Sequence, residues 1–161
     1  MTPEDFIEFL KPAFPYVKSR GYFPSVFAGQ ASLETGWGKT LPIVGFNMFG
    51  HKWNAGEPWA YYIKETPEQR GDTMNIEQHR FRVYPNLDAA VKAYCDKWEE
   101  VYEQSGEPKY PDQDFSSPQA FIESVAVNYC TDQKYADKII ALIEEWSLEQ
   151  YDDPNLYSKG E

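Results

Sequence analysis

The sequence predicts an α+β domain, mostly α-helical, in which a helical body carries a small β-hairpin lobe and the two flank a cleft. Apolar residues recur at intervals of three and four near the N-terminus and in the second half of the chain, as on the buried face of a helix. That period disappears between Thr40 and Arg82, where glycine, asparagine and aromatic residues are frequent. The chain has 161 residues, 42% of them hydrophobic, which is enough for one core. We therefore expect one folded domain over residues 1–147 and a polar tail or linker over 148–161.

The first helix is expected to begin at Thr2, a favourable N-cap residue that precedes Pro3. Pro12 is expected to interrupt it, because proline removes a helical hydrogen bond, and Gly21 is expected to end it. A second helix is expected from about Pro24 to Gly36.

The middle of the chain predicts the hairpin. Residues 57–66 (EPWAYYIKET) and 79–84 (HRFRVY) have the composition of short strands. Residues 67–75 (PEQRGDTMN) between them are expected to form a long loop. A cleft between this lobe and the helical body is the natural place for a ligand.

Three further helices are expected in the second half. Asn86 is the expected N-cap of the first, which has a strong apolar stripe, and Ser117 with Pro118 is expected to start the next. Asp132 is expected to cap the last long helix.

Composition and charge exclude several kinds of partner. The formal net charge is −11, which argues against nucleic acid and against anionic lipid, because both require a basic surface. No run of about 18 apolar residues is present, so no membrane insertion is expected. The N-terminal MTPEDFIEFL lacks the basic and apolar regions of a signal peptide.

Neither a metal nor an organic cofactor is expected. His51 and His79 are far apart in sequence and form no ligand motif. Cys95 and Cys130 lie at apolar positions of helical patterns, which favours two buried thiols over a disulfide. We expect a monomer.

Glu34 is an acid among apolar residues in the last turn of the second predicted helix. Burial removes hydration from its carboxylate, and the helix C-terminus adds a partial negative charge, so both effects disfavour ionisation. A carboxyl group that remains protonated near neutral pH can donate a proton to a leaving oxygen, as the general acid of a glycosidase does. A solvated glutamate at a helix end is the alternative interpretation.

Three stretches around Glu34 carry a family resemblance. They are SVFAGQASLETGWGKT (25–40) followed by FNMFGHKW (46–53), then FRVY (81–84), and finally NYCTDQKYADKI (128–139). In this order they resemble the signature of peptidoglycan β-N-acetylglucosaminidases of the flagellar-hydrolase and autolysin type, glycoside hydrolase family 73. Gly29 and Thr35 replace the usual alanine and serine, and Cys130 stands where alanine is usual.

The resemblance implies a lysozyme-like fold with Glu34 as proton donor. It implies cleavage of the β-1,4 bond after N-acetylglucosamine in peptidoglycan glycan strands. Action at the bacterial cell wall would follow, by a secreted or phage-associated protein.

The resemblance also places a second acid on the β lobe and a tyrosine opposite the first. Glu68 matches the second acid, with Glu65 and Glu77 as rivals because the loop spacing departs from that of the family. Tyr129 matches the tyrosine that faces the catalytic acid. Whether the route is water-mediated inversion or assistance by the acetamide group of the substrate stays open.

Several residues are candidates for sugar contacts, since an aromatic ring can stack on a pyranose face. Trp53 and Trp59 are favoured because they lie in polar, glycine-containing sequence. Trp37 is more consistent with bracing the acid, and Asn47 is expected either to hold a turn or to bind an N-acetyl group. The full set is Asn47, Trp53, Trp59, Tyr61 and Trp37.

Two alternative functions fit the same residues. One is a muramidase or lytic transglycosylase of the same fold, for which a transglycosylase would not need Glu68. The other is an inactive glycan-binding or phage-tail structural module, which would bind sugar without turnover.

Overall fold

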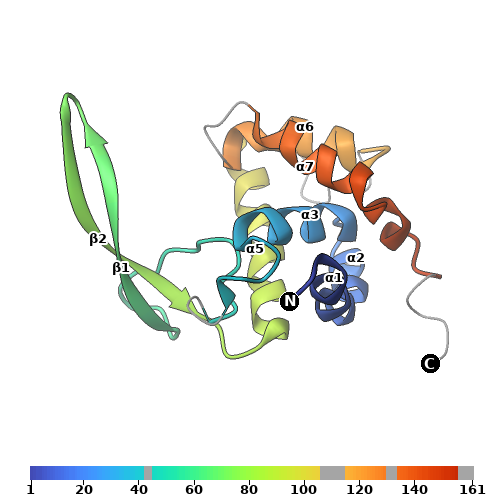
Figure 1. The fold of residues 1–161 in the computed structure, drawn as a ribbon, viewed down its shortest axis with the longest axis horizontal. Helices are drawn as coiled ribbons and strands as arrows, with labels where there is room; N and C mark the ends of the chain where they lie inside the picture. The colour runs from blue at the N-terminus through green and yellow to red at the C-terminus, as the bar shows by residue number, and fades with distance from the viewer. Residues whose placement is uncertain (42–44, 106–114, 130–133, 156–161) are drawn as a thin grey trace.

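The structure is a computed structural model that describes residues 1–41, 45–105, 115–129 and 134–155, with the backbone alone for 101–105 and 127–129. A helical body lies on one side and a long two-stranded hairpin projects from it (Figure 1). The elements are α1 (Pro3–Leu10), η1 (Lys11–Ala13), α2 (Phe14–Ser19), α3 (Pro24–Thr35), β1 (Ala60–Arg70), β2 (Thr73–Val83), α5 (Leu87–Ser105), α6 (Pro118–Tyr129), α7 (Tyr135–Glu145) and η3 (Leu148–Asp152). The predicted α+β class, mostly α with a hairpin lobe, is confirmed.

The N-terminal region folds as the sequence predicts. Thr2 and Asp5 form a reciprocal capping box, in which the Asp5 amide donates to Thr2 Oγ1 (3.1 Å) and the Thr2 amide to Asp5 Oδ2 (3.3 Å). Pro12 lies within the 3-10 turn η1, which separates α1 from α2. Gly21 follows α2 with a positive φ of 87°.

Helix α3 is the centre of the body and is buried on nearly all sides. It contacts α1, α2, α6, α7 and η3. Its small residues allow this, as Gly29 shows, where an added Cβ would lie 3.3 Å from a side-chain carbon of Ile139. Because neighbours surround α3, its position is fixed by packing rather than by a single apolar stripe.

The hairpin is longer than predicted. Residues 67–75, expected to form a loop, instead complete two antiparallel strands of 11 residues each. Gly71 and Asp72 make a two-residue turn with a positive φ of 61° at Gly71, the position where a type II′ turn requires glycine. Pro67 stands opposite Ile76 without ending the strand. Proline is tolerated there because β1 is an edge strand.

The base of the hairpin is fixed to the body by the segment before β1. Lys52 bridges to Phe81, and the Trp53 amide donates to the Arg80 carbonyl (2.9 Å). The Arg82 amide donates to the His51 carbonyl (3.0 Å). The hairpin therefore has support at its base, whereas its distal half is a two-stranded ribbon.

A second network completes this base. The Arg82 guanidinium pairs in a two-pronged arrangement with Glu57 (2.7 and 2.8 Å) and also donates to the Tyr84 hydroxyl (3.2 Å). Burial lowers the pKa of His51 to about 3, so His51 is neutral and its Nδ1, 2.8 Å from the Tyr84 hydroxyl, can accept that proton.

The C-terminal end of the body differs from the prediction. Residues 148–152 were expected in a polar tail, but Leu148 is fully buried and Tyr151 packs on Phe14 with ring centroids 5.1 Å apart. Asp152 accepts hydrogen bonds from the amide (2.8 Å) and hydroxyl (2.7 Å) of Ser25, at the start of α3. The packed domain therefore extends to Asp152.

The remaining helix predictions have mixed outcomes. Asn86 and Ser117 cap the starts of α5 and α6 as expected, each accepting a hydrogen bond from a backbone amide.

Cys95 is buried, which raises the pKa of its thiol to about 12. Cys130 and Asp132 lie outside the described residues. In the described part of the chain, no helix has the length and apolar character needed to cross a membrane.

Candidate active site

Glu34 lies in the last turn of α3, where the helix ends by a tight reversal. Gly36 and Trp37 both have positive φ values, 56° and 61°, and the Trp37 amide donates to the Ser32 carbonyl. Two left-handed residues in succession turn the chain sharply away, and Gly36 accommodates this without the steric cost of a side chain. This turn leaves Glu34 and the neighbouring Leu33 exposed, whereas the other residues of α3 are buried.

A chain of hydrogen bonds leads from the core to Glu34. The Tyr94 hydroxyl of α5 donates to Gln30 Oε1 (2.7 Å), and Gln30 Nε2 donates to the Tyr135 hydroxyl (3.2 Å). Tyr135 in turn donates to Glu34 Oε1 (3.3 Å). Gln30 and Glu34 are four residues apart and thus share one face of α3. The carboxyl group is therefore held from α3, α5 and α7 at once.

The surroundings of Glu34 favour its protonated form. Burial raises the pKa of the Glu34 carboxyl, and the hydrogen bond from Tyr135 opposes that rise without cancelling it. The direction of the shift agrees with the expectation from sequence. The sequence gives no signal for Tyr135 as a site residue, because an aromatic residue at helical spacing is typical of a core, yet Tyr135 is both buried and bonded to the acid.

The turn after Glu34 is packed rather than exposed. Trp37 contacts Phe6 edge-on (centroids 6.4 Å apart) and Trp146 (5.1 Å). Gly38 follows with φ 86°, and a Cβ there would lie 2.8 Å from the Phe6 ring, so any other residue would be strained at this position. Trp37 thus braces the end of α3.

The register of the hairpin decides which acids share a face. Thr66 pairs with Glu77, so Glu68, two residues further along β1, projects on the same side as Glu77. Glu65 projects on the opposite side. Thr66 Oγ1 donates to Glu68 Oε1 (3.1 Å), whereas both oxygens of Glu77 are held by Arg70 Nη2 (2.9 Å).

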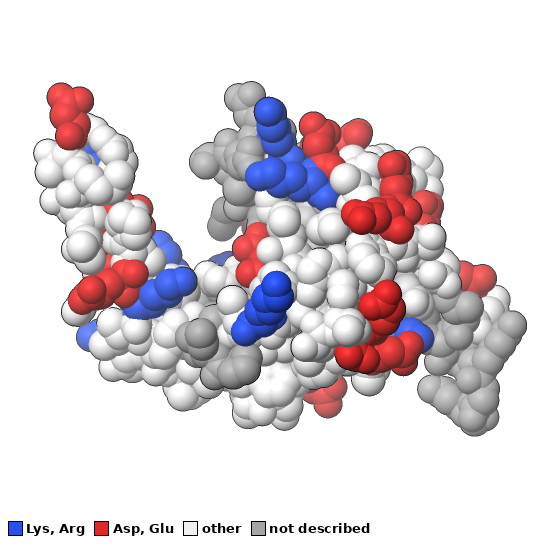
Figure 2. Space-filling view, in the orientation of Figure 1, with Lys and Arg blue, Asp and Glu red and all other residues white. Residues whose placement is uncertain are grey.

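The two faces of the hairpin differ in exposure. The face with Glu68 holds the half-buried residues, and the other carries Ile63, Met74 and Ile76, which are 55%, 60% and 74% exposed. The surface is hollowed between the hairpin and the helical body (Figure 2).

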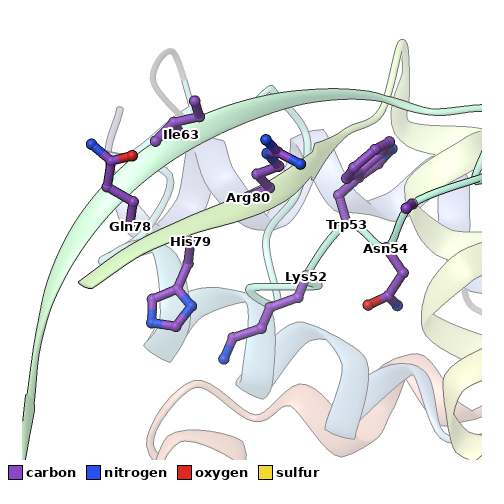
Figure 3. Close-up of a pocket in the computed structure, with 8 residues that line it drawn as sticks. Lys52, Trp53, Asn54, Ile63, Gln78, His79 and Arg80 are labelled. Atoms are coloured by element: carbon purple, nitrogen blue, oxygen red, sulfur yellow. The ribbon is translucent and has the colours of Figure 1, made fainter.

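Aromatic residues gather beside β2 near its base. The rings of Trp53 and Tyr61 lie 4.5 Å apart, and the Arg80 guanidinium lies over both, at 5.6 and 5.1 Å from their centroids. A hollow of about 400 Å³ opens here, lined by Trp53, Arg80 and Lys52 among others. Along β2, His79 and Arg80 point to opposite sides of the strand (Figure 3).

Asn47 and Trp59, two other predicted sugar contacts, make contacts within the protein. Asn47 is 2% exposed, donates to the carbonyls of His51 and Arg82 and accepts from the His51 amide, so its amide group holds the turn. Trp59 packs edge-on against Tyr84 (4.9 Å), and its carbonyl accepts the Trp53 indole proton. Tyr129 is the last residue of α6, and its side chain lies outside the described part.

Comparison with known proteins gives consistent matches. Residues 11–148 match the model of a family named Glucosaminidase and described as mannosyl-glycoprotein endo-beta-N-acetylglucosaminidase. The chain is 29% identical over 147 residues to the peptidoglycan hydrolase FlgJ of Vibrio parahaemolyticus, covering 86% of the chain and 46% of that protein. It is 26% identical over 160 residues to an autolysin of Enterococcus faecalis, covering 96% and 21%. The chain thus spans less than half the length of these curated relatives.

A solved structure supports the fold. The catalytic domain of the autolysin Auto from Listeria monocytogenes superposes with a TM-score of 0.78 at 24% identity, covering 93% of this chain and 87% of that one.

Proposed function

The chain belongs to the Glucosaminidase family, and on that premise we propose that it hydrolyses bacterial peptidoglycan at the β-1,4 bond after N-acetylglucosamine, with Glu34 as general acid. The observation that carries the proposal is the carboxyl group of Glu34, which reaches the surface beside Leu33 at the end of a largely buried helix and whose pKa is raised by its partial burial. The FlgJ and autolysin relatives support the substrate class.

Glu34 would deliver its proton to the glycosidic oxygen as the bond to the leaving sugar breaks. A raised pKa increases the protonated fraction of Glu34 at a given pH, and a carboxyl group can transfer the proton at the moment charge develops. Tyr135 donates to the Oε1 atom, so Oε2 is the oxygen that would carry the proton to the substrate. The buried positions of Gln30 and Tyr94 keep this geometry in place before substrate binds.

Glu68 is the second carboxylate that we favour on the hairpin. Glu65 projects on the opposite face, and Glu77 is already paired with Arg70, whereas Glu68 shares the half-buried face and accepts a hydrogen bond from Thr66. It would activate water on the far side of the sugar ring, or orient the acetamide group of the substrate if that group attacks. Tyr129 stays a proposed partner of Glu34.

Trp53 and Tyr61 are the rings that we propose for sugar contact, beside the hollow at the base of the hairpin. Tyr61 projects on the strand face opposite Glu68, so these rings would contact the glycan away from the bond that is cut. Trp59 could extend the same surface, since it lies next to Trp53. We assign Asn47 and Trp37 to structural support of the site, because the first is buried and the second packs on Phe6.

The proposal is tested by digesting purified peptidoglycan and reading the released fragments by mass spectrometry. We expect fragments with N-acetylglucosamine at the reducing end from the wild type and none from Glu34→Gln. The matched control is Glu145→Gln, the same change at the exposed end of α7, which should digest as the wild type does.

The products separate the alternatives. Reducing ends of N-acetylmuramic acid, or its anhydro form, would assign the chain to muramidase or lytic transglycosylase chemistry. Binding to peptidoglycan by both wild type and Glu34→Gln, without release from several wall types, would favour a glycan-binding or tail-structural module.

A further inference from the structure

Three potential metal ligands meet on the half-buried face of the hairpin. Glu68 comes from β1, and Glu77 and His79 come from β2. Strand pairing of Thr66 with Glu77 places all three on one side of the sheet. One ligand atom from each residue lies within 4.8 Å of the others.

His79 provides the second observation. Its Nε2 atom is buried and forms no hydrogen bond within the described residues, although Glu68 Oε1 is 3.3 Å away. Glu68 is therefore a charge partner of this nitrogen and not a hydrogen-bond partner, whereas buried nitrogen atoms in proteins nearly always have a hydrogen bond. An imidazole nitrogen directed at two carboxylates is a ligand set that a cation can satisfy.

We propose that Glu68, Glu77 and His79 bind a divalent transition-metal ion, with zinc as the preferred ion. Carboxylate oxygen and imidazole nitrogen are both zinc ligands, and three protein ligands leave a fourth position for water. Magnesium and calcium favour all-oxygen sites, so the histidine selects against them. In tetrahedral coordination the ligand atoms would be about 3.3 Å apart, which small side-chain rotations on the hairpin can achieve.

Arg70 is the competitor for this site, because it holds both oxygens of Glu77. The Arg70 side chain is 63% exposed and that of Glu77 is 32% exposed. An ion pair this exposed contributes little and is screened by salt, so an incoming cation can displace the guanidinium into solvent. The site leaves no signal in the sequence, because its ligands are spread over two strands and include no pair of histidines.

Occupation would have a consequence for catalysis that rests on the proposed function. A metal ion on Glu68 would neutralise the second carboxylate and hold it on the hairpin. Zinc would then act as a reversible inhibitor, and it would also cross-link β1 to β2.

The binding test needs no substrate. Cobalt(II) is titrated into the protein while the visible absorption of the ion is followed, and zinc binding is measured by calorimetry. We expect one ion per chain for the wild type and at least about 10-fold weaker binding for His79→Gln and for Glu77→Gln, since even second-shell partners change metal affinity 10–100-fold.

The matched control is Glu65→Gln, which removes the same charge from β1 on the opposite face and should bind zinc as the wild type does. Absence of binding to the wild type, or equal binding by wild type and His79→Gln, would overturn the proposal. Backbone amide spectra of each variant confirm that the hairpin is intact.

Peptidoglycan turnover with added zinc tests the consequence separately. We expect inhibition of the wild type, reversal by a chelator, and resistance in His79→Gln. If the wild type binds zinc with His79-dependent affinity and yet keeps its full rate, the metal site stands and the proposed role of Glu68 is contradicted.

Discussion

The helical body and the hairpin present their carboxyl groups in opposite ways. Glu34 is held through Tyr135 and Gln30 to Tyr94, so three helices fix one side chain. Glu68 lies on a two-stranded ribbon whose opposite face is open to solvent. A shifted protonation state requires a packed, poorly hydrated setting, which the body provides. The hairpin can instead change position without disturbing the core that sets this shift.

The contrast predicts that a core substitution in the body destabilises the protein much more than a substitution on the hairpin. Phe27 of α3 is fully buried against Phe14, Phe49 and Tyr94. We expect Phe27→Ala to lower the free energy of unfolding by about 3–5 kcal/mol, because it leaves a cavity in the core. Chemical denaturation measures the change.

The matched control on the hairpin is Ile76→Ala, at a side chain that is 74% exposed. Surface substitutions usually change stability by about 0.5 kcal/mol or less. If Phe27→Ala and Ile76→Ala lowered the free energy of unfolding by similar amounts, the hairpin and the body would form one cooperative core.

Substitution of Glu68 tests whether the hairpin contributes to catalysis without contributing to stability. We expect Glu68→Gln to lower the rate of peptidoglycan cleavage about 100-fold with little change in stability, since a positioned base contributes on the order of 10²–10⁴. Initial rates with labelled peptidoglycan measure this, and Glu65→Gln serves as the control on the opposite face. An unchanged rate for Glu68→Gln would point to a transglycosylase route.

Tyr135→Phe examines how the body tunes Glu34. Tyr135 lowers the pKa of Glu34 against the effect of burial, so its removal raises that pKa further. Activity that needs protonated Glu34 should then persist to higher pH than in the wild type, which a pH–rate profile measures. The loss of a partner for the Gln30 amide should also cost about 1–2 kcal/mol of stability. A shift of the profile to lower pH would contradict the hydrogen-bond direction.

Asp152 tests where the packed body ends, through the pH dependence of stability. Burial raises the pKa of Asp152 to about 6, from 3.8. A raised folded-state pKa means that the native state binds the proton more tightly, so this contribution to stability is present below about pH 4 and lost as pH rises to about 6. Relative to Asp152→Asn, the wild type should lose about 3 kcal/mol across that interval. Parallel pH–stability curves for the two proteins would place Asp152 outside the packed body.

Features of the fold that are set by residues close together in sequence could be predicted, whereas features that depend on distant residues could not. Helix α3 and the odd acid at its end were readable because Pro24, Gly36 and the apolar neighbours of Glu34 all lie within one short segment. The hairpin was recognised, but Pro67 concealed the continuous strand and the Gly71 turn was overlooked. The face on which each acid lies was therefore unknown, because it depends on the register that this turn sets.

Tyr135 shows the other limit. It is 101 residues from Glu34 and matches a helical core stripe, so only the folded chain brings its hydroxyl to the acid. The shared face of Gln30 and Glu34 was a signal that a polar chain runs along α3, but it did not identify the partners.

The two-residue turn at Gly71 fixes the strand register, which limits how the strands between the hairpin base and Glu68 can be lengthened. Strand residues alternate between faces, so one extra residue in each strand below Glu68 would turn that carboxyl group to the opposite side. Only insertions of two residues per strand restore its direction, and each such step moves Glu68 outward by about 7 Å. Related proteins that keep an acid on this face should therefore have hairpins whose lengths between base and acid differ by even numbers of residues.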